Sequence, residues 1–224
     1  MTFSLAGRCA RTGMLGVVVT SSSPAVAARC AWARAGVGAV ATQNVTDPSL
    51  GPQVLDRISS GRSAADALDE VIAVTQHAPF RQLGVIDFRS RTAAYSGTRT
   101  LGLHASVAGE DCIATGNLLA DEGVPAAMVC AFERSSRDHL ADRLLEALRA
   151  GEAAGGEEGP VRSCGLVVVG DVSWPITDLR VDWHADPTGE LGRLWEIWRP
   201  LENDYLLRAT DPAAAPSYGV PGDE

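Results

Sequence analysis

The stretch TFSLAGRCARTGMLGVVVT, residues 2–20, places two short apolar segments on either side of a polar turn. In the first segment Phe3 and Leu5 alternate with smaller residues, and the second, LGVVVT (15–20), is rich in β-branched valine. Alternation and valine content are typical of strands, and the short polar connection suits a hairpin. We therefore expect the chain to begin inside a β-sheet rather than as a loose end.

Two later pairs of segments repeat this pattern. QLGVIDF (82–88) joins TAAYSG (92–97) through the polar turn RSR, and CGLVVVGD (164–171) joins ITDLRVDW (176–183) through VSWP. Each pair predicts another antiparallel hairpin. Single strands are expected at 37–44 and 112–116.

Helical patterns fill the intervals between the hairpins. Leu68 and Val71 begin an apolar spacing of three and four residues after Ser63, which is a typical N-cap residue. Asp186 followed by Pro187 is a start signal for a last helix. Two more amphipathic helices are expected around 124–132 and 140–148.

Hairpins in two groups with helices between them predict an α+β fold in which two sheets pack together and helices cover their outer faces. A doubly wound nucleotide-binding fold would need strict alternation of strand and helix and a Gly-rich first turn. The nearest candidate, RAGVGAV (34–40), lacks the third glycine and a following helix. We expect one domain over residues 1–201 and a C-terminal arm over residues 202–224, which are rich in proline and alanine.

Composition removes several functional classes. With 19 basic and 28 acidic side chains the formal net charge is -9, which repels phosphate backbones and argues against nucleic-acid binding. The sequence contains no lysine, so neither a Schiff-base lysine nor a P-loop lysine is available. No apolar stretch approaches the ~20 residues of a membrane span.

The five cysteines are an odd number without CxxC spacing, which argues against a disulfide framework and a zinc site. A reducing, cytoplasmic location is therefore expected. The alternative is a secretory signal, with MLGVVVT (14–20) as its apolar core and SPAVA (23–27) as its cleavage site. That apolar run is short, and its valines favour a strand.

Several segments together resemble a known family. They are MTFSLAGR (1–8), the stretch from SSSP to PSLG (21–51), TGNLLA (115–120) and DLRVDWHADPTGEL (178–191). The sequence is similar to the bacterial family called domain of unknown function 1028, which is placed in the N-terminal-nucleophile (Ntn) hydrolase superfamily. The resemblance implies a four-layer αββα sandwich and a hydrolase of carbon–nitrogen bonds whose natural substrate is unsettled.

Thr2 is the predicted nucleophile. An initiator methionine is normally trimmed before a small side chain, so Thr2 would carry both a hydroxyl and a free α-amine. Such an amine titrates near ~7.7, close to working pH, and a threonine paired with its own amine is a known form of activated nucleophile. The alternative is that Thr2 is a permissive second residue with good β propensity.

Supporting groups are expected near strand ends. Asn117 could donate an N–H to a developing oxyanion, or simply cap the turn that follows. Gln43 could orient substrate, although we favour a structural hydrogen bond for it.

Ser22 and Ser23 could bind substrate or form a plain turn before proline. Arg29 and Arg34 flank Trp32 and could grip a carboxylate, although exposed arginines far from any site are common. Many members of the resembled family carry a lysine at the position of Ser22, so a lysine-assisted mechanism is not available here.

Two remaining features favour structural roles. Asp182 and His184 could form an acid–base or metal pair, but a lone histidine favours a structural hydrogen bond, so neither a metal nor a cofactor is expected. Trp195 and Trp198 lie three residues apart on the last helix and indicate a core or a subunit interface, which leads us to expect a homo-oligomer.

The leading hypothesis is an amidohydrolase of Ntn type that cleaves an amide, lactam or ureido bond in a small molecule with Thr2. The alternative is a non-catalytic small-molecule-binding protein of the same fold that keeps Met1. A cysteine hydrolase using Cys9 or Cys30 is a third possibility, although neither lies in a recognisable Cys-His context.

Overall fold

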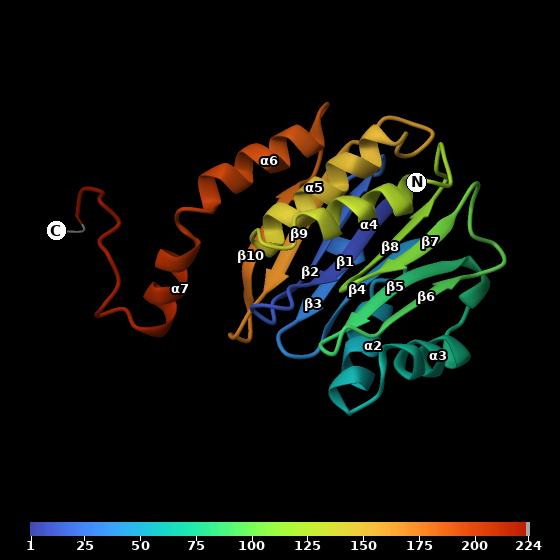
Figure 1. Ribbon diagram of the computed structural model, residues 1–224, viewed down its shortest axis with the longest axis horizontal. Helices are drawn as coiled ribbons and strands as arrows, with labels where there is room; N and C mark the ends of the chain where they lie inside the picture. The colour runs from blue at the N-terminus through green and yellow to red at the C-terminus, as the bar shows by residue number, and fades with distance from the viewer. Residues whose placement is uncertain (223–224) are drawn as a thin grey trace.

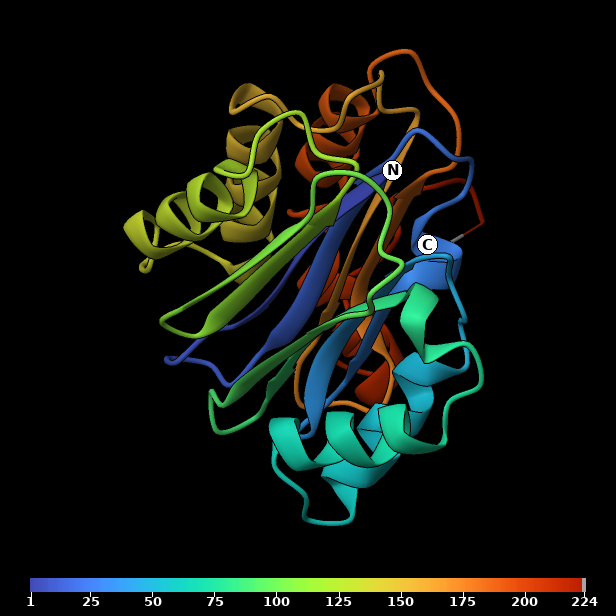
Figure 2. The same ribbon diagram turned by 90° about the vertical axis from the view of Figure 1, so that its right-hand side faces the viewer.

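The computed structural model describes residues 1–222 and contains two antiparallel sheets that lie face to face. Helices cover the outer face of each sheet, so the layers run helix, sheet, sheet, helix (Figures 1 and 2). This is the α+β, four-layer αββα sandwich that the hairpins and the family resemblance predicted.

The larger sheet has the order β10-β9-β2-β1-β8-β7, which puts the first strand in its interior. The predicted first hairpin is confirmed, because β1 and β2 pair in continuous register from Thr2 opposite Ser21 to Arg8 opposite Leu15. The strands of this sheet are β1 (Thr2–Arg8), β2 (Leu15–Ser21), β7 (Ala105–Gly109), β8 (Cys112–Asn117), β9 (Ser163–Val169) and β10 (Pro175–Val181).

The smaller sheet has the order β3-β4-β5-β6 and packs its inner face on the larger one. The two sheets approach closely at Gly84, where an added Cβ would lie only 2.9 Å from the Thr115 methyl carbon. A side chain there would push the sheets apart. The strands are β3 (Ala31–Arg34), β4 (Gly38–Asn44), β5 (Arg81–Asp87) and β6 (Thr92–Ser96).

The helices form the two outer layers. Helices α4 (Val124–Arg134), α5 (Leu140–Ala153) and α6 (Pro187–Trp198) pack on the larger sheet, and α2 (Leu50–Ser59) and α3 (Ala64–Val74) pack on the smaller one. A short helix α1 (Ala27–Cys30) and a 3-10 turn (Ala78–Phe80) lie in the connections.

Two predicted helix starts are confirmed by their caps. The Ser63 side chain accepts a hydrogen bond from Asp66 N at 3.1 Å, and Asp186 accepts one from Gly189 N at 2.9 Å. Each satisfies an amide that the first helical turn leaves free. The sequence patterns did not predict α2, β3, β7 or the helix that follows α6.

Apolar side chains fill three interfaces. One cluster lies between the larger sheet and α4, α5 and α6, and a second lies between the smaller sheet and α2 and α3. A third, smaller cluster lies between the two sheets and contains Ala6, Leu15 and Ile86. Burial of apolar surface on both faces of each sheet therefore holds the four layers together.

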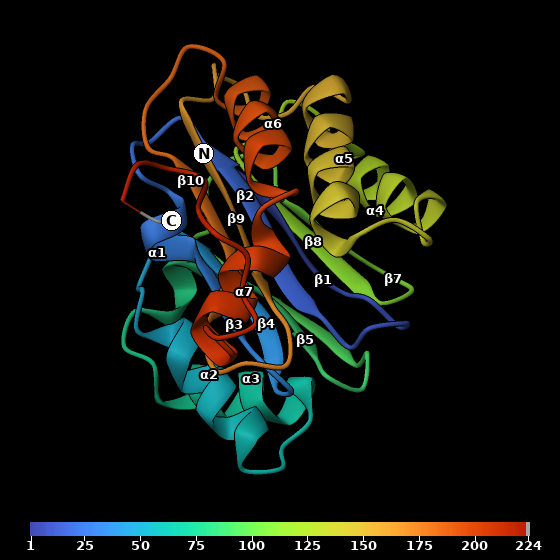
Figure 3. The same cartoon turned by 90° about the vertical axis from the view of Figure 1, so that its left-hand side faces the viewer.

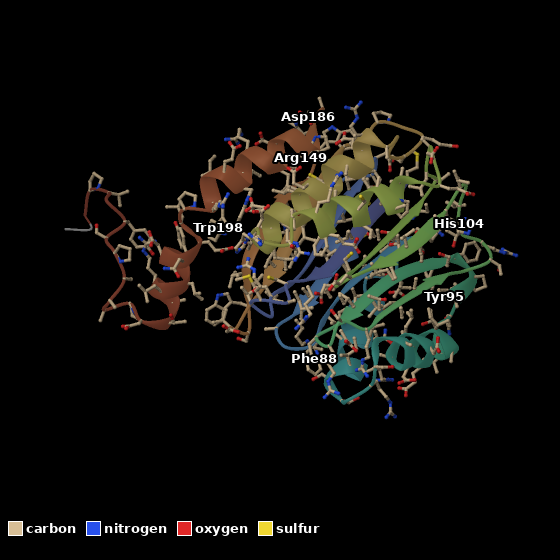
Figure 4. All side chains as sticks on the ribbon, viewed as in Figure 1. Phe88, Tyr95, His104, Arg149, Asp186 and Trp198 are labelled. Carbon is tan, nitrogen blue, oxygen red and sulfur yellow. The ribbon has the colours of Figure 1, made fainter. Side chains whose placement is uncertain are left out.

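The predicted C-terminal arm contains a helix, α7 (Glu202–Thr210), which contacts edge strand β10 beyond the end of α6 (Figure 3). Trp198, near the end of α6 (Figure 4), stacks on Tyr205 of α7 at 5.0 Å between ring centroids. Trp195 is 3% exposed in the core and donates to Asp142. The two tryptophans thus pack within their own chain, and the homo-oligomer stays a prediction.

Residues 223 and 224 of the predicted arm lie outside the described residues. Among residues 1–222, no helix combines the length and the apolar character that crossing a bilayer requires.

Candidate active site

Thr2 lies at the start of β1 with a strand hydrogen-bonded on either side. It stands opposite Ser21 of β2 and opposite Asn117 of β8. Residues directly opposite each other in antiparallel strands project from the same face of the sheet, so the three polar side chains converge. Thr2 is 5% exposed and the other two are fully buried. The register of the sheet therefore builds a buried polar cluster around Thr2.

A carbonyl oxygen and a second hydroxyl group contact the Thr2 hydroxyl. Its Oγ1 is hydrogen-bonded to the Met1 carbonyl oxygen and lies 3.2 Å from Ser21 Oγ. Ser21 Oγ also donates to the Met1 carbonyl and lies 2.8 Å from Ser23 Oγ. The Met1 carbonyl oxygen thus accepts hydrogen bonds from two hydroxyl groups.

A chain of side-chain amides fixes the orientation of Asn117. Gln82 Nε2 donates to the Gly116 carbonyl oxygen at 3.0 Å, so its Oε1 must be the acceptor for Asn117 Nδ2 at 3.0 Å and for Gln43 Nε2 at 2.9 Å. Gln43 Oε1 in turn accepts from Ser4 Oγ at 2.7 Å. With Nδ2 fixed toward Gln82, Asn117 Oδ1 is left buried without a hydrogen-bond partner among residues 1–222.

Glu157 enters the site from the loop after α5. Its backbone bridges Leu119, two residues beyond Asn117, and it is 5% exposed. The preceding Gly156 has φ +61°, a backbone conformation that favours glycine. The loop thus contacts two segments near Thr2. It pairs with the chain just after β8, and the Glu157 side chain lies close to Ser22, just after β2.

Burial raises the pKa of the Glu157 carboxyl, because desolvation disfavours the charged form. The Ser22 side chain and backbone and the positive charge at the start of the chain lower this pKa in part. Neither carboxyl oxygen makes a hydrogen bond of good geometry with a described residue. Glu157 is therefore a buried acid without a full set of partners.

Ser23 and Arg29 lie beside this cluster. The guanidinium of Arg29 donates to the carbonyl oxygens of Pro24 and Ala25 at 2.8 and 3.0 Å and lies 3.3 Å from Ser23 Oγ. Arg29 thus holds the loop after β2, in which Ala25 has φ +50°.

Arg34 is not brought to the cluster. It ends β3 opposite Gly38, the first residue of β4, and its guanidinium pairs with Asp56 at 2.8 Å on an exposed surface. Gly38 lies five residues along β4 from Gln43, and a strand rises about 3.3 Å per residue, so Arg34 is at the far end of the smaller sheet.

The His184 ring has a structural partner. Asp186 N donates to His184 Nδ1 at 3.1 Å, next to the start of α6. Residues 1–222 contain no group of three or more His, Cys, Asp or Glu side chains that could hold a metal ion.

Sequence reasoning missed two residues of the site, Gln82 and Glu157. Gln82 is the second residue of β5 and reaches Asn117 only because the two sheets pack face to face. Glu157 lies in a loop whose sequence, AAGGEEGP (153–160), reads as a plain turn. Neither position carries a local signal. Ser21 belongs to the serine run that the sequence indicated, but the register with Thr2 sets it apart from its neighbours.

The fold and the site define a class: a four-layer αββα sandwich with a threonine buried at the start of an interior strand. Residues 2–191 match a family described as "Family of unknown function (DUF1028)". The chain belongs to that family, as its sequence resemblance implied.

Two solved structures are similar to this chain. Protein SPO2555 from Silicibacter pomeroyi, of the same family, is 29% identical over 88% of each chain, with a TM-score of 0.81. Anbu (ancestral beta-subunit) from Yersinia bercovieri is 11% identical over 97% of this chain and 100% of its own, with a TM-score of 0.38. A search of curated proteins gave no match.

Proposed function

We propose that the protein is an N-terminal-nucleophile hydrolase of a carbon–nitrogen bond (amide, lactam or ureido) in a small molecule. Thr2 acts as the nucleophile once the bond between Met1 and Thr2 has been cut. The observation that supports this most is the buried Thr2 hydroxyl at the start of an interior strand, in contact with a second hydroxyl and a carbonyl oxygen. A nucleophile must be held still, and β1 is hydrogen-bonded on both sides.

The base in this proposal is the α-amine of Thr2 itself. While Met1 is attached, the nitrogen of Thr2 is a peptide nitrogen and has no basic lone pair. Cutting the bond converts it to a primary amine with a basic lone pair, attached to the carbon next to the one that bears the hydroxyl. The mature chain would then supply nucleophile and base from one residue.

The reaction proceeds in two halves. Thr2 Oγ1 attacks the substrate carbonyl carbon while its proton moves to the α-amine, and the tetrahedral intermediate collapses as the leaving nitrogen takes that proton. The acyl group is then an ester on Thr2. Water attacks this ester, gives a proton to the amine, and releases the acid as Oγ1 regains the proton.

Two groups are placed to stabilise the oxyanion. Ser21 Oγ already donates to the carbonyl oxygen of Met1, so it reaches an acyl oxygen bound next to Thr2. Asn117 uses one N–H of its amide for Gln82 and retains a second. Loss of one oxyanion donor typically lowers kcat by about 10²–10³.

The remaining predicted residues form the rim and the support of the proposed site. Ser22 and Ser23 lie on the loop after β2, Arg29 lies in α1, and all three would contact substrate. Gln43 donates to Gln82 Oε1, the same oxygen that accepts from Asn117. Arg34 is outside the proposed site. All five cysteines are free thiols, which supports a reducing, cytoplasmic location.

The decisive experiment combines intact mass with a screen of amides, lactams and ureido compounds. We expect a mass that starts at Thr2, and we expect Thr2→Ala to lose at least about 10³-fold in kcat/KM. Thr12→Ala, in the exposed turn of the first hairpin, is the matched control and should keep the parent rate.

A native protein that retains Met1 and binds small molecules without cleaving them would instead be the non-catalytic binder. Hydrolysis by Thr2→Ala at the parent rate would exclude Thr2 as the nucleophile.

A further inference from the structure

Two buried side chains near Thr2 carry acceptor atoms that make no hydrogen bond of good geometry with a described residue. They are Glu157, through both carboxyl oxygens, and Asn117, through Oδ1, on the strand next to Thr2. A buried acceptor without a well-placed donor is unfavourable, and most buried polar groups in folded proteins are paired. Two such side chains close to one end of the larger sheet indicate a place for a group that brings donors with it.

Met1 shows what kind of group fits. Its carbonyl oxygen receives the hydroxyls of Thr2 and Ser21, and its α-ammonium is close enough to lower the pKa of Glu157 against the opposite effect of burial. Its side chain lies near Gly159, where an added Cβ would be 3.4 Å from Met1 Cε. Met1 is chemically an aminoacyl group with a free ammonium, bound with its carbonyl at the nucleophile.

We propose that Glu157 binds a positively charged nitrogen on the acyl side of the substrate, so that the substrates are α-aminoacyl amides such as amino-acid amides or the N-terminal residues of short peptides. The inference rests on the proposed function and names the substrate class of that site. Once Met1 has left, a substrate of this class would place its carbonyl beside Thr2 and its ammonium beside Glu157.

A charged nitrogen fits this position better than a neutral one. An ammonium group carries three donors and a full positive charge, whereas an amide or hydroxyl would leave the buried carboxylate charge uncompensated. Hydrogen bonds between charged partners are roughly twice as strong as neutral ones. The other possible partner is the freed α-ammonium of Thr2 itself, and the experiment below separates the two.

The test measures binding apart from hydrolysis. The chain is prepared as Thr2→Ala with Met1 absent, as verified by mass, and is titrated calorimetrically with L-methioninamide and with its des-amino analogue. We expect the charged ligand to bind at least about tenfold more tightly. Glu157→Gln in this background should remove the difference, and Glu158→Gln, at an exposed neighbouring position, should keep it.

Equal binding of the two ligands, or a preference that survives in Glu157→Gln, would overturn the inference and leave Glu157 as a partner of the Thr2 amine. The ligand pair gives this answer in the Glu157 parent even if Glu157→Gln does not fold. If binding depends on the ammonium group but the native protein hydrolyses nothing, the role of Glu157 stands and the proposed hydrolase function is refuted. If neutral amides are hydrolysed as fast as aminoacyl amides are, the hydrolase function stands and the role of Glu157 is refuted.

Discussion

The two ends of the space between the sheets differ in chemistry although the same strands form both. On the inward face of β1, Thr2 and Ser4 lie at one end and Ala6 lies toward the other. Around Ala6 the neighbours are apolar, including Val17 and Ile86. Around Thr2 they are buried hydroxyls, amides and an acid. The side chains at both ends are buried, so the polar end is not simply a solvent-exposed edge.

The two ends make different demands on the fold. Buried apolar side chains need only close packing, whereas each buried amide needs a hydrogen-bond partner for every N–H and C=O. Gln82 meets this demand with four hydrogen bonds to neighbours from both sheets. The orphaned acceptors of Asn117 and Glu157 do not, which is typical of a site that keeps polar groups for a ligand.

The largest expected change in stability comes from removing the Gln82 amide, which links the polar side chains around Thr2. Gln82→Leu keeps the side-chain volume but leaves Gln43 Nε2 and Asn117 Nδ2 without their acceptor and removes the hydrogen bond to the Gly116 carbonyl oxygen. At about 1–3 kcal/mol for each of the two orphaned donors, we expect the free energy of unfolding to fall by at least about 2 kcal/mol. Chemical denaturation measures this loss.

The control for Gln82 is Gln53→Leu, on the outer helix α2, where the side-chain amide donates to Ser49 Oγ within the same helix end. We expect a change within about 0.5 kcal/mol there. An equally small loss in Gln82→Leu would show that the amide chain does not hold the two sheets together.

A smaller effect is expected at the apolar end. Ile86→Val removes one buried methylene-sized group from the cluster between the sheets and should cost about 0.5–1.5 kcal/mol. Because Ile86 lies four residues along β5 from Gln82, kcat/KM per folded molecule should not change. A loss of activity without a matching loss of folded protein would mean that the two ends are coupled.

The hairpins and helix caps could be predicted from the sequence because their causes are local. Apolar alternation before CARTG and valine content after it indicate the first hairpin, and Ser63 and Asp186 cap helices through contacts three residues away. Helix α2 was missed because Gly51 and Pro52 fall in its first turn, where proline is tolerated but the pattern looks like a loop. Strand β7 is half-exposed and short, so its alternation is weak.

The site could be predicted only in part for the same reason. Thr2 and Asn117 stand opposite each other across two strands far apart in sequence, and only the sheet order brings them together. Gln82 reaches them from the other sheet, and Glu157 reaches them from a loop. Arg34 shared a sequence neighbourhood with Arg29, yet the β3–β4 hairpin carries it away from Thr2. Spacing along the chain does not encode such distances.

The smallest expected effect is the pH dependence of folding stability caused by Glu157, and its direction shows whether the polar end is structural. Because the pKa of Glu157 is raised in the folded protein, the folded state holds a proton that the unfolded state releases as pH rises past the ordinary carboxyl value of about 4.3. Folding stability contributed by this group therefore falls as pH rises from there through the raised pKa, and stays lower above it. Burial is the main cause, and the positive charge at the start of the chain only partly offsets it.

Replacing Glu157 with glutamine, which carries no charge, should remove this penalty. We expect Glu157→Gln to have a higher Tm than the parent at pH 7, and this gain in Tm should shrink as pH falls toward 4. The control is Glu158→Gln, at the exposed neighbouring position, whose Tm should change little at either pH. Each kcal/mol gained corresponds to about 2–4 °C for a chain of this size. A lower Tm at pH 7 would mean that the carboxylate stabilises the fold, and the polar end would then be structural. A higher Tm in Glu157→Gln would mean that the Glu157 carboxylate lowers the stability of the fold. This is expected of a group that is retained because it binds a ligand.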